Sequence, residues 1–362
     1  MNLLFYAPQM AAYGGMERHV CGLATAAARA GHRVTLLTTS NSLGSDLRGE
    51  LGEASVGLRE LGIARGRAGG IAKLAWLLAQ TFRARTQRWD VVYTNGQSAL
   101  ARLVWRAAGR GTRIIHHHHT AADAREQATW SPAFRRVLRA APELVGCSEA
   151  TCAALNAATG RGDAHFLPYL TRCPVPAGEV VAVPARTPLR LGFMGRLIPE
   201  KGIDTVVRLA GEPGLPEVEW HIHGEGPAYP AGFFRNRPRL VYHGAYRTSA
   251  EQAAALRALD GLTLFSSHNE GMPLSLLEGM SAGLPLLATD QGGTRELAVS
   301  PHDTFLLPAM PDFPTVVAGV QAFTAAIRSG QTSRPRQRAA YDRHFSPAIV
   351  SARWLEFLSG KA

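Results

Sequence analysis

The chain has 362 residues, of which 46% are hydrophobic and 19% charged, and this length suits two globular domains of roughly 180 residues each. No stretch approaches the roughly 18 to 20 consecutive apolar residues of a membrane-spanning helix, so we expect no transmembrane segment. The first apolar run, residues 2–7, is too short for a secretory signal. The four cysteines show no Cys-x-x-Cys spacing, which predicts reduced thiols in the cytoplasm, with Cys21 and Cys147 as buried small hydrophobic residues.

The net charge of +11 is concentrated in the first half of the chain. Residues 1–180 contain 21 Lys and Arg against 12 Asp and Glu, whereas the remainder contains 18 against 16. Nucleic acid is disfavoured as a partner, because neither a DNA-reading motif nor interleaved aromatic residues accompany the basic ones. An anionic membrane surface or a phosphate-bearing acceptor fits better. The alternative is biased composition, since Arg outnumbers Lys 36 to 3.

The chain opens with the pattern of a β–α–β unit. A strand at 2–7 leads to a loop ending in Gly14 and Gly15, a helix begins near Met16, and a second strand follows at 34–38. The glycines are not spaced as Gly-x-Gly-x-x-Gly, which argues against a dinucleotide-binding fingerprint. Lacking side chains, they instead let the backbone approach a ligand closely.

A basic helix follows a glycine-rich stretch. Residues 41–70 are interrupted by eight glycines and are predicted to be mostly loop. The helix at 71–85 either lies in a membrane interface or covers the sheet in the ordinary way. We favour the second interpretation, because a parallel sheet needs apolar helices on both faces. The side chains concerned are Lys73, Leu74, Trp76, Leu77, Leu78, Arg83 and Arg85.

Four consecutive histidines lie in the strand pattern at 113–120. Side chains of a strand alternate between its faces, so at most two of the four share a face, and a three-ligand zinc site built from them alone is geometrically poor. If the strand continues far enough, His117 and His119 lie on the same face. A later strand at 142–148 leads into a helix that we expect Ser148 to cap.

Frequent Pro and Gly at 171–188 predict a linker, after which the second domain opens as the first did. A strand at 189–194 is followed by Gly195. Arg196 and Lys201 then lie in the turn at the carboxyl end of this strand, where doubly wound sheets bind ligands. Two cations beside a helix start suit a pyrophosphate, although two solvated surface cations are the alternative interpretation.

The next distinctive unit carries two carboxylates. A strand at 262–265 delivers a polar turn at 266–271, and Pro273 begins a helix. Glu270 lies in the turn and Glu278 about two turns into the helix, so both can face one ligand at the helix N-terminus, where free N–H groups suit a phosphate. Glu278 needs a partner if it is buried, and ribose hydroxyls are suitable. A side chain reaching solvent is the alternative.

Together with Gly292, Gly293 and Glu296, these residues resemble the signature of family-four retaining glycosyltransferases of the GT-B fold, which is α/β with two Rossmann-like doubly wound domains facing each other across a cleft. The resemblance is strongest from residue 192 to 296. The residues that it implies for catalysis are His119, Arg196, Lys201 and Glu270. Those that it implies for donor binding are Gly14, Gly15, Gly195, Arg196, Lys201, Gly224, Glu270, Gly271, Met272, Pro273, Leu274 and Glu278.

The resemblance also implies a domain plan and a function. The plan is an acceptor-side domain (1–170), a linker (171–188), a nucleotide-sugar-binding domain (189–345) and a helix that crosses back to the first domain (346–362). The function is transfer of a sugar, with retention, from a UDP- or GDP-sugar to a glycan or lipid-linked acceptor in lipopolysaccharide, O-antigen, capsule or exopolysaccharide synthesis. The alternatives are a sugar-nucleotide epimerase on the same fold and a non-catalytic nucleotide-binding module.

No cofactor is expected beyond the donor substrate. The sequence contains no Asp-x-Asp motif, so we expect metal-independent activity in which Arg196, Lys201 and helix N-termini stabilise the leaving diphosphate. The expected partners are the nucleotide sugar, the glycan or lipid-linked acceptor and an anionic membrane surface, without nucleic acid. The expected location is the cytoplasm, with peripheral attachment to the inner membrane.

Overall fold

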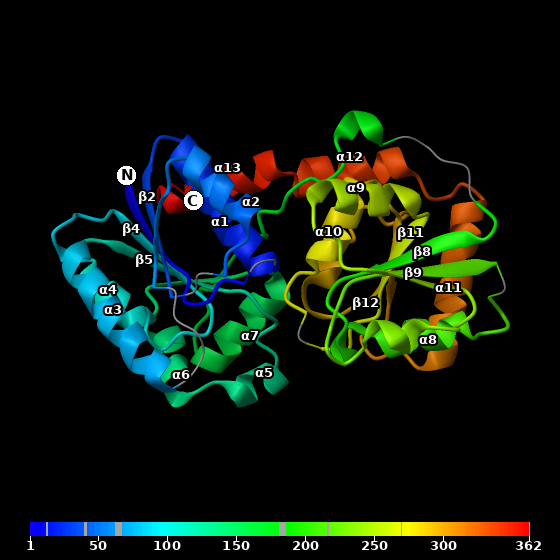
Figure 1. Cartoon of the computed structure of the whole chain (residues 1–362), viewed down its shortest axis with the longest axis horizontal. Helices are drawn as coiled ribbons and strands as arrows, with labels where there is room; N and C mark the ends of the chain where they lie inside the picture. Colours follow the sequence, from blue (N-terminus) through cyan, green and yellow to red (C-terminus); the bar gives the residue numbers. More distant parts are fainter. Residues whose placement is uncertain are drawn as a thin grey trace. The chain divides into compact units, whose positions relative to one another are not determined.

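The computed structural model describes residues 1–11, 14–39, 42–61, 67–180, 186–215, 217–268 and 270–361. The chain divides into two compact units (Figure 1): unit 1 contains Met1–Thr171 and Val350–Ala362, and unit 2 contains Arg172–Ile349. The sequence placed the first boundary after residue 170 and the returning helix at 346. Each unit holds one parallel sheet between helices, which confirms the expectation of two Rossmann-like α/β domains.

Unit 1 is built on a seven-stranded parallel sheet in the order β3-β2-β1-β4-β5-β6-β7. The strand order reverses direction between β1 and β4, and such a switch point leaves room for a ligand beyond the carboxyl ends of the strands. The strands are β1 (Asn2–Tyr6), β2 (Arg33–Thr38), β3 (Gly57–Glu60), β4 (Val91–Asn95), β5 (Arg113–His118), β6 (Glu143–Gly146) and β7 (His165–Phe166).

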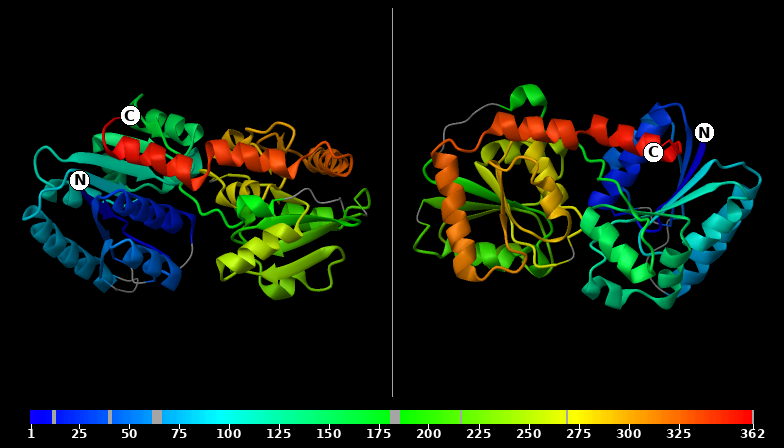
Figure 2. Two further views of the ribbon diagram at one scale, coloured as in Figure 1. Left: turned by 90° about the horizontal axis from the view of Figure 1, so that it is seen from above. Right: turned by 180° about the vertical axis from the view of Figure 1, so that it is seen from behind.

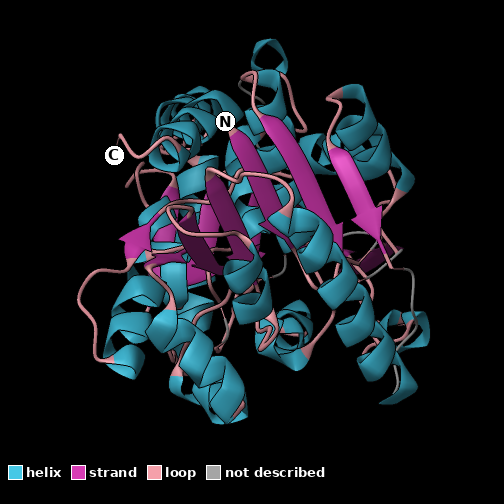
Figure 3. Ribbon diagram, turned by 90° about the vertical axis from the view of Figure 1, so that its left-hand side faces the viewer, coloured by secondary structure: helices cyan, strands magenta, loops and turns pink. Residues whose placement is uncertain are grey.

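Helices cover both faces of this sheet (Figure 3). One apolar cluster joins α1, α2 and α13 to one face, and a second cluster joins α3, α4, α6 and α7 to the other. Burial on both faces explains why β1 and β2 read as continuous apolar runs. The helices are α1 (Gly15–Arg29), α2 (Ser45–Glu53), α3 (Arg67–Arg85), α4 (Ala101–Ala107), α5 (Ala124–Thr129), α6 (Pro132–Ala140), α7 (Glu149–Thr159) and α13 (Pro347–Leu358).

The expectation that residues 41–70 are loop-rich was wrong for the described part of that range, because α2 and β3 form there. Residues 41 and 62–66 lie outside the described residues. Leu47 and Leu51 are four residues apart, so they fall on the same side of α2 and are both buried. Gly49 and Gly52 weaken the helix without preventing it, since tertiary packing of the leucines outweighs their low propensity. The predicted cap is confirmed: Ser148 Oγ accepts a hydrogen bond of 3.0 Å from the backbone N–H of Thr151.

Unit 2 is built on a six-stranded parallel sheet in the order β10-β9-β8-β11-β12-β13, with its switch point between β8 and β11. Its strands are β8 (Leu189–Met194), β9 (Val218–His223), β10 (Leu240–Gly244), β11 (Gly261–Leu264), β12 (Leu286–Thr289) and β13 (Thr304–Leu307). Its α-helices are α8 (Ile203–Ala210), α9 (Ser249–Ala258), α10 (Leu274–Ser281), α11 (Phe313–Arg328) and α12 (Arg334–His344). Its 3₁₀ helices are η1 (Ala177–Glu179), η2 (Pro199–Lys201), η3 (Ala231–Phe234) and η4 (Gly292–Leu297). No helix in the described part of the chain has the length and hydropathy of a membrane span.

Helix α13 completes the core of unit 1, which therefore contains both ends of the described chain (Figure 2). Trp354 is fully buried, and its indole N–H donates a hydrogen bond of 2.9 Å to the carbonyl oxygen of Pro168. Its ring lies 5.1 Å from the ring of His19 and 5.0 Å from that of His117, centroid to centroid. The last helix of the chain is thus part of the first domain's interior.

Trp354→Ala should destabilise unit 1 by about 3–5 kcal/mol, because it removes a large buried ring and leaves a cavity. Hydrogen exchange of the β1 amides, compared with those of β9, measures the loss in unit 1 separately from unit 2. Trp354→Phe is the control: it keeps most of the packing and should cost less. Equal loss of protection in β1 and β9 would contradict this role for α13.

Candidate active site

Two loops at the switch point of unit 2 touch through their backbones. After β8, the chain passes through η2 and reaches Gly202, which has a positive φ of +76°. A Cβ atom at this position would lie 2.2 Å from the carbonyl oxygen of Phe265, in the loop after β11. The N–H of Ser267 also donates a 3.0 Å hydrogen bond to the carbonyl of Glu200. Glycine at 202 therefore lets the two loops lock together.

This contact pairs Lys201 with Glu270. Lys201 Nζ donates a hydrogen bond of 2.5 Å to Glu270 Oε2, and Ser266 Oγ donates one of 2.9 Å to the same oxygen. Glu270 is only 4% exposed, so its ionised carboxylate needs such partners. The sequence interpretation had assigned the two residues to separate parts of a ligand and had missed this ion pair. The signal was present, since both residues follow adjacent strands of a parallel sheet.

Gly292 and Gly293 hold the Glu270 turn from the other side. Gly292 has a φ of +52°, and a Cβ atom there would lie 1.5 Å from the carbonyl oxygen of Glu270. The N–H of Gly293 donates a 2.7 Å hydrogen bond to the carbonyl of Gly271. The Gly-Gly pair of the sequence signature therefore has a structural reason, which is close backbone contact with the turn that carries the carboxylate.

Arg196 differs from Lys201 in having no structural partner. Its side chain is exposed and makes no hydrogen bond or ion pair with any part of the chain that the structure describes. A guanidinium in this position is available to bind an anion with two hydrogen bonds. The alternative that Lys201 is a solvated surface cation is wrong, because Lys201 is paired with a buried carboxylate.

Glu278 lies in the second turn of α10 and is 4% exposed, so the alternative in which it reaches solvent is wrong. Pro273 forms the N-cap of this helix, as the sequence suggested for its start. The first N–H groups of α10 lack partners within the helix and form a potential anion site beside Glu270. In the loop after β9, the hydroxyl of Tyr229 donates to Asp204 Oδ2 at 2.5 Å, which anchors this loop to α8.

The anticipated site residues fall into two sets. The set in unit 2 lies at or beyond the carboxyl ends of β8, β9 and β11 and consists of Gly195, Arg196, Lys201, Gly224, Glu270, Gly271, Met272, Pro273, Leu274 and Glu278. The set in unit 1 lies beyond the carboxyl ends of β1 and β5 and consists of Gly14, Gly15 and His119. Gly14 is the N-cap of α1, and Gly15 is its first residue.

The four histidines of β5 alternate between faces, as the strand pattern predicted. His117 and His119 lie together, with ring centroids 4.0 Å apart, whereas His116 and His118 pack against Phe134 on the other face. Tyr169 stacks on His119 at 5.5 Å and donates a hydrogen bond to its carbonyl oxygen. His119 is thereby fixed in place just beyond the end of β5.

Burial keeps His19, His116, His117 and His119 neutral. It lowers the pKa of His19 and of His116 to about 3 and the pKa values of His117 and His119 well below the ordinary value. A neutral imidazole can be enclosed in an apolar layer at much lower cost than an imidazolium. The carboxyl end of the unit 1 sheet therefore presents uncharged rings, in contrast to the charged pair of unit 2.

Glu126 is the charged group behind this layer. Its carboxylate accepts hydrogen bonds from His118 Nε2 at 2.8 Å, Thr120 Oγ at 2.6 Å and the N–H of Ala122 at 2.8 Å. Burial raises the pKa of Glu126, but these donors outweigh burial and lower it to about 2. The ionised carboxylate therefore gathers residues 118–122 around itself and holds the segment that contains His119.

Acid should destabilise unit 1. The pKa of an unfolded His is about 6.5, whereas the pKa values of folded His19 and His116 are about 3. Between these pH values the unfolded chain therefore binds more protons than the folded chain, and acid favours unfolding. The free energy of unfolding should then fall by up to about 1.4 kcal/mol per pH unit for each of the two. Glu126 adds to the loss below about pH 4.5, because its pKa is lowered in the folded state.

Urea unfolding at pH 7.5, 6.5 and 5.5 measures this slope. His19→Gln should flatten it, whereas His302→Gln, which changes an exposed histidine, should leave it unchanged. A slope that is the same in both variants would rule out buried His19 as its source.

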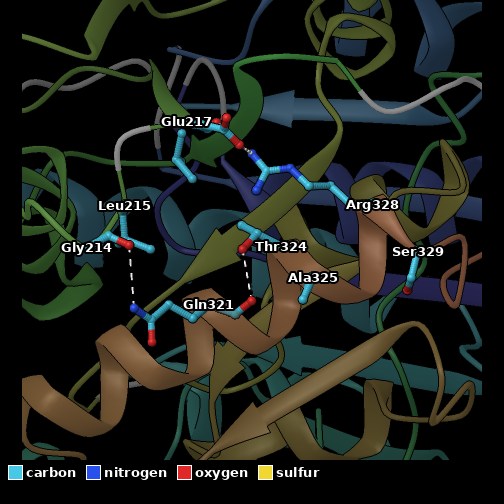
Figure 4. Close-up of a pocket in the computed structure, with 9 residues that line it drawn as sticks. Gly214, Leu215, Glu217, Gln321, Thr324, Ala325, Arg328 and Ser329 are labelled. Atoms are coloured by element: carbon cyan, nitrogen blue, oxygen red, sulfur yellow. Dashed lines mark hydrogen bonds and ion pairs between the residues drawn. The ribbon is translucent and has the colours of Figure 1, made fainter.

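A groove of about 620 Å³ lies elsewhere in unit 2, between the segment before β9 and the helix α11 (Figure 4). Glu217 and Arg328 form an ion pair of 2.7 Å across it. The lining residues outside α11 precede or begin β9, so the groove lies at the opposite end of this strand from the Gly224 loop. We assign the groove no part in the site. In the described portion of the chain, no cluster of His, Cys, Asp or Glu could hold a metal ion.

Two parallel sheets, with a charged site at the switch point of one, define a two-domain protein of the doubly wound α/β class. Residues 13–168 match the family model Glycosyltransferase Family 4, and residues 188–328 match the model Glycosyl transferases group 1. The chain therefore belongs to the family-four, group 1 glycosyltransferases of the GT-B fold.

Curated relatives and solved structures agree with this assignment. A GDP-mannose-dependent α-mannosyltransferase of Mycobacterium tuberculosis is 36% identical over 123 residues, which is 34% of this chain and only 31% of that protein. A D-inositol 3-phosphate glycosyltransferase of Kineococcus radiotolerans is 27% identical over 78% of this chain and 74% of its own length.

Two solved structures share the fold over nearly the whole chain. HepE of Anabaena in complex with UDP has a TM-score of 0.76 at 18% identity and covers 99% of this chain and 100% of its own. The lipopolysaccharide outer core galactosyltransferase WaaB has a TM-score of 0.75 at 16% identity and covers 100% of both chains.

Proposed function

We propose that the protein is a retaining, metal-independent glycosyltransferase that moves a sugar from a nucleotide diphosphate sugar to a glycan or lipid-linked acceptor. The observation that carries this proposal is the Lys201–Glu270 pair at the switch point. The loop after β8 that supplies Lys201 also carries Arg196, whose exposed guanidinium has no partner among the described residues. Family membership supports it. The alternatives, a sugar-nucleotide epimerase and a non-catalytic module, are outcomes of the test below.

In the proposed reaction, the bond between the sugar's anomeric carbon and the diphosphate oxygen breaks, and the acceptor hydroxyl replaces the diphosphate on the same face of the sugar. Negative charge develops on the departing diphosphate. Arg196, Lys201 and the first N–H groups of α10 are placed to stabilise that charge. The proton of the acceptor hydroxyl passes to the departing diphosphate, so that neither a metal nor a separate base is needed.

Glu270 has a different part in this proposal. Its Oε2 atom is occupied by Lys201 and Ser266, whereas Oε1 makes no hydrogen bond with the described residues. A carboxylate oxygen in this state can accept a hydrogen bond from a sugar hydroxyl and orient the ring. Glu278 would bind the ribose. In unit 1, His119, Gly14 and Gly15 remain the predicted donor-contacting residues.

The donor is a UDP-sugar or a GDP-sugar. Likeness to HepE in complex with UDP supports the first, and likeness to the GDP-mannose-dependent mannosyltransferases supports the second. The acceptor would be a glycan or lipid-linked glycan in the synthesis of lipopolysaccharide, O-antigen, capsule or exopolysaccharide. Structural likeness to WaaB and the basic first half of the chain support this class of acceptor, which is reached from the cytoplasm.

A panel of nucleotide diphosphates and their sugars tests the proposal. The true nucleotide, at ~100 times its dissociation constant, should stabilise the protein by roughly 2.7 kcal/mol in a thermal unfolding assay. Its sugar should then be transferred to a lipid-linked glycan with retained anomeric configuration, with or without EDTA. Epimer formation without acceptor would favour the epimerase, binding without turnover would favour the non-catalytic module, and loss of turnover in EDTA that manganese restores would refute metal independence.

Arg196→Ala should lower kcat by roughly 10²- to 10³-fold, the range for losing one preorganised electrostatic contact, and should leave the melting temperature unchanged because Arg196 has no structural partner. Lys201→Ala should lower both kcat and the melting temperature, since it also leaves Glu270 buried without its counter-charge.

Glu270→Gln should depress sugar transfer while the affinity for the nucleoside diphosphate stays within a few fold. Kinetics and nucleotide titration of the three variants measure this, and abolished diphosphate binding in Glu270→Gln would contradict its assignment to the sugar.

A further inference from the structure

The outer face of α3 carries an unusual row of exposed apolar side chains. Ile71 is 76% exposed, Leu74 39%, Leu78 48% and Phe82 72%. These four make up more than half of the large apolar side chains exposed in the described part of the chain, the others being Met1, Met310 and Ile349. Their spacing of three or four residues puts them on one side of the helix. We call them the apolar stripe.

The inward face of α3 has more polar character than the apolar stripe. Leu77 is buried and Trp76 is partly buried against the core, whereas the residues buried next to them, Gln80 and Thr81, are polar and 6% and 7% exposed. Only one charged residue, Lys73, occurs between Ile71 and Phe82, and it is half-buried. An ordinary sheet-covering helix has the reverse polarity. The sheet-covering interpretation favoured from the sequence therefore accounts for Trp76 and Leu77 and leaves the apolar stripe unexplained.

The apolar stripe belongs to a predominantly basic stretch of the chain. Residues 67–110, which span α3, β4 and α4, contain eight Lys and Arg and a single acidic residue, Asp90. The Asp90 carboxylate accepts a 2.7 Å hydrogen bond from the backbone N–H of Asn2. Helix α4 packs beside α3 at the edge of unit 1 (Figure 1). The cations without an ion pair among the described residues are Lys73, Arg83, Arg88, Arg102, Arg106 and Arg110.

We propose that unit 1 docks on an anionic lipid bilayer through α3, with the apolar stripe in the interface and the cations of α3 and α4 at the lipid headgroups. Large apolar side chains flanked by Lys and Arg are what an interfacial helix requires. Charge decides between a bilayer and a second copy of this chain. Anionic headgroups attract the cluster, whereas a second copy pairing through α3 would bring two such clusters against each other.

This inference goes beyond the proposed sugar transfer, because it names a surface and a partner that the switch-point site does not involve. The two can fail separately. A protein that binds vesicles and transfers no sugar would refute only the proposed function. One that transfers sugar to a soluble acceptor and ignores vesicles would refute only the docking surface.

Co-sedimentation of the full chain with vesicles tests the surface. Vesicles of phosphatidylcholine with about one-third phosphatidylglycerol should capture the protein at low salt and release most of it at high salt, since charge is screened within about 8 Å at physiological ionic strength. Pure phosphatidylcholine vesicles should capture little. The double variant Leu78→Ser with Phe82→Ser should lower the partition coefficient by on the order of 100-fold, about tenfold for each apolar side chain that leaves the interface.

Met310→Ser is the matched control, because Met310 is 71% exposed, close to the 72% of Phe82, and lies in unit 2. It should bind anionic vesicles like the parent protein. Arg102→Gln with Arg106→Gln should weaken capture at low salt only. Equal capture by both vesicle types would overturn the proposal. So would unchanged binding of the Leu78/Phe82 variant, or a dimer in solution that this variant converts to a monomer.

Discussion

A buried carboxylate must bring positive charge and hydrogen-bond donors with it, and in unit 2 this requirement fixes the arrangement of the whole switch point. An uncompensated charge at the position of Glu270 would cost several kcal/mol. Lys201 reaches it only because Gly202 lets the loop after β8 lie against Phe265, and the turn itself keeps its shape because Gly292 leaves room for its carbonyl. The loops after β8, β11 and β12 are therefore held together around the carboxylate of Glu270. The exposed side chain of Arg196 takes no part in these contacts.

The two units share a topology and differ in how they treat charge at the carboxyl ends of their strands. Unit 2 pairs Lys201 with Glu270 and leaves a guanidinium exposed. Unit 1 places neutral imidazoles there, packed against Tyr169 and Trp354, and keeps the carboxylate of Glu126 behind them under several donors. The first arrangement favours contact with anionic groups, and the second favours contact with uncharged ones.

Much of the fold followed from local pattern. Parallel strands buried on both faces leave continuous apolar runs, so β1, β8 and β11 were recognisable, as was the alternation of His116 to His119. Patterns fail where tertiary contacts decide. In α2, two leucines outweigh two glycines, and α12 has charged or polar residues through most of its length, so neither helix was anticipated. The Lys201–Glu270 pair joins residues far apart in sequence. A sequence motif identifies each of the two residues but does not show that they form an ion pair. Sequence also supplied both interpretations of α3, but only exposure could show that four of its apolar residues face outward.

The place of α13 has a consequence for how the protein is made. Residues 350–358 fill the interior of the domain that begins at residue 1, and Trp354 bonds to Pro168 there. During synthesis, residues 1–171 leave the ribosome before unit 2 is made. Until α13 is made, the apolar residues that pack against it in unit 1 remain uncovered. Its core closes only when the last helix has left the exit tunnel. Unit 1 is thus completed after unit 2, and a ribosome that stalls before residue 358 leaves its core incomplete.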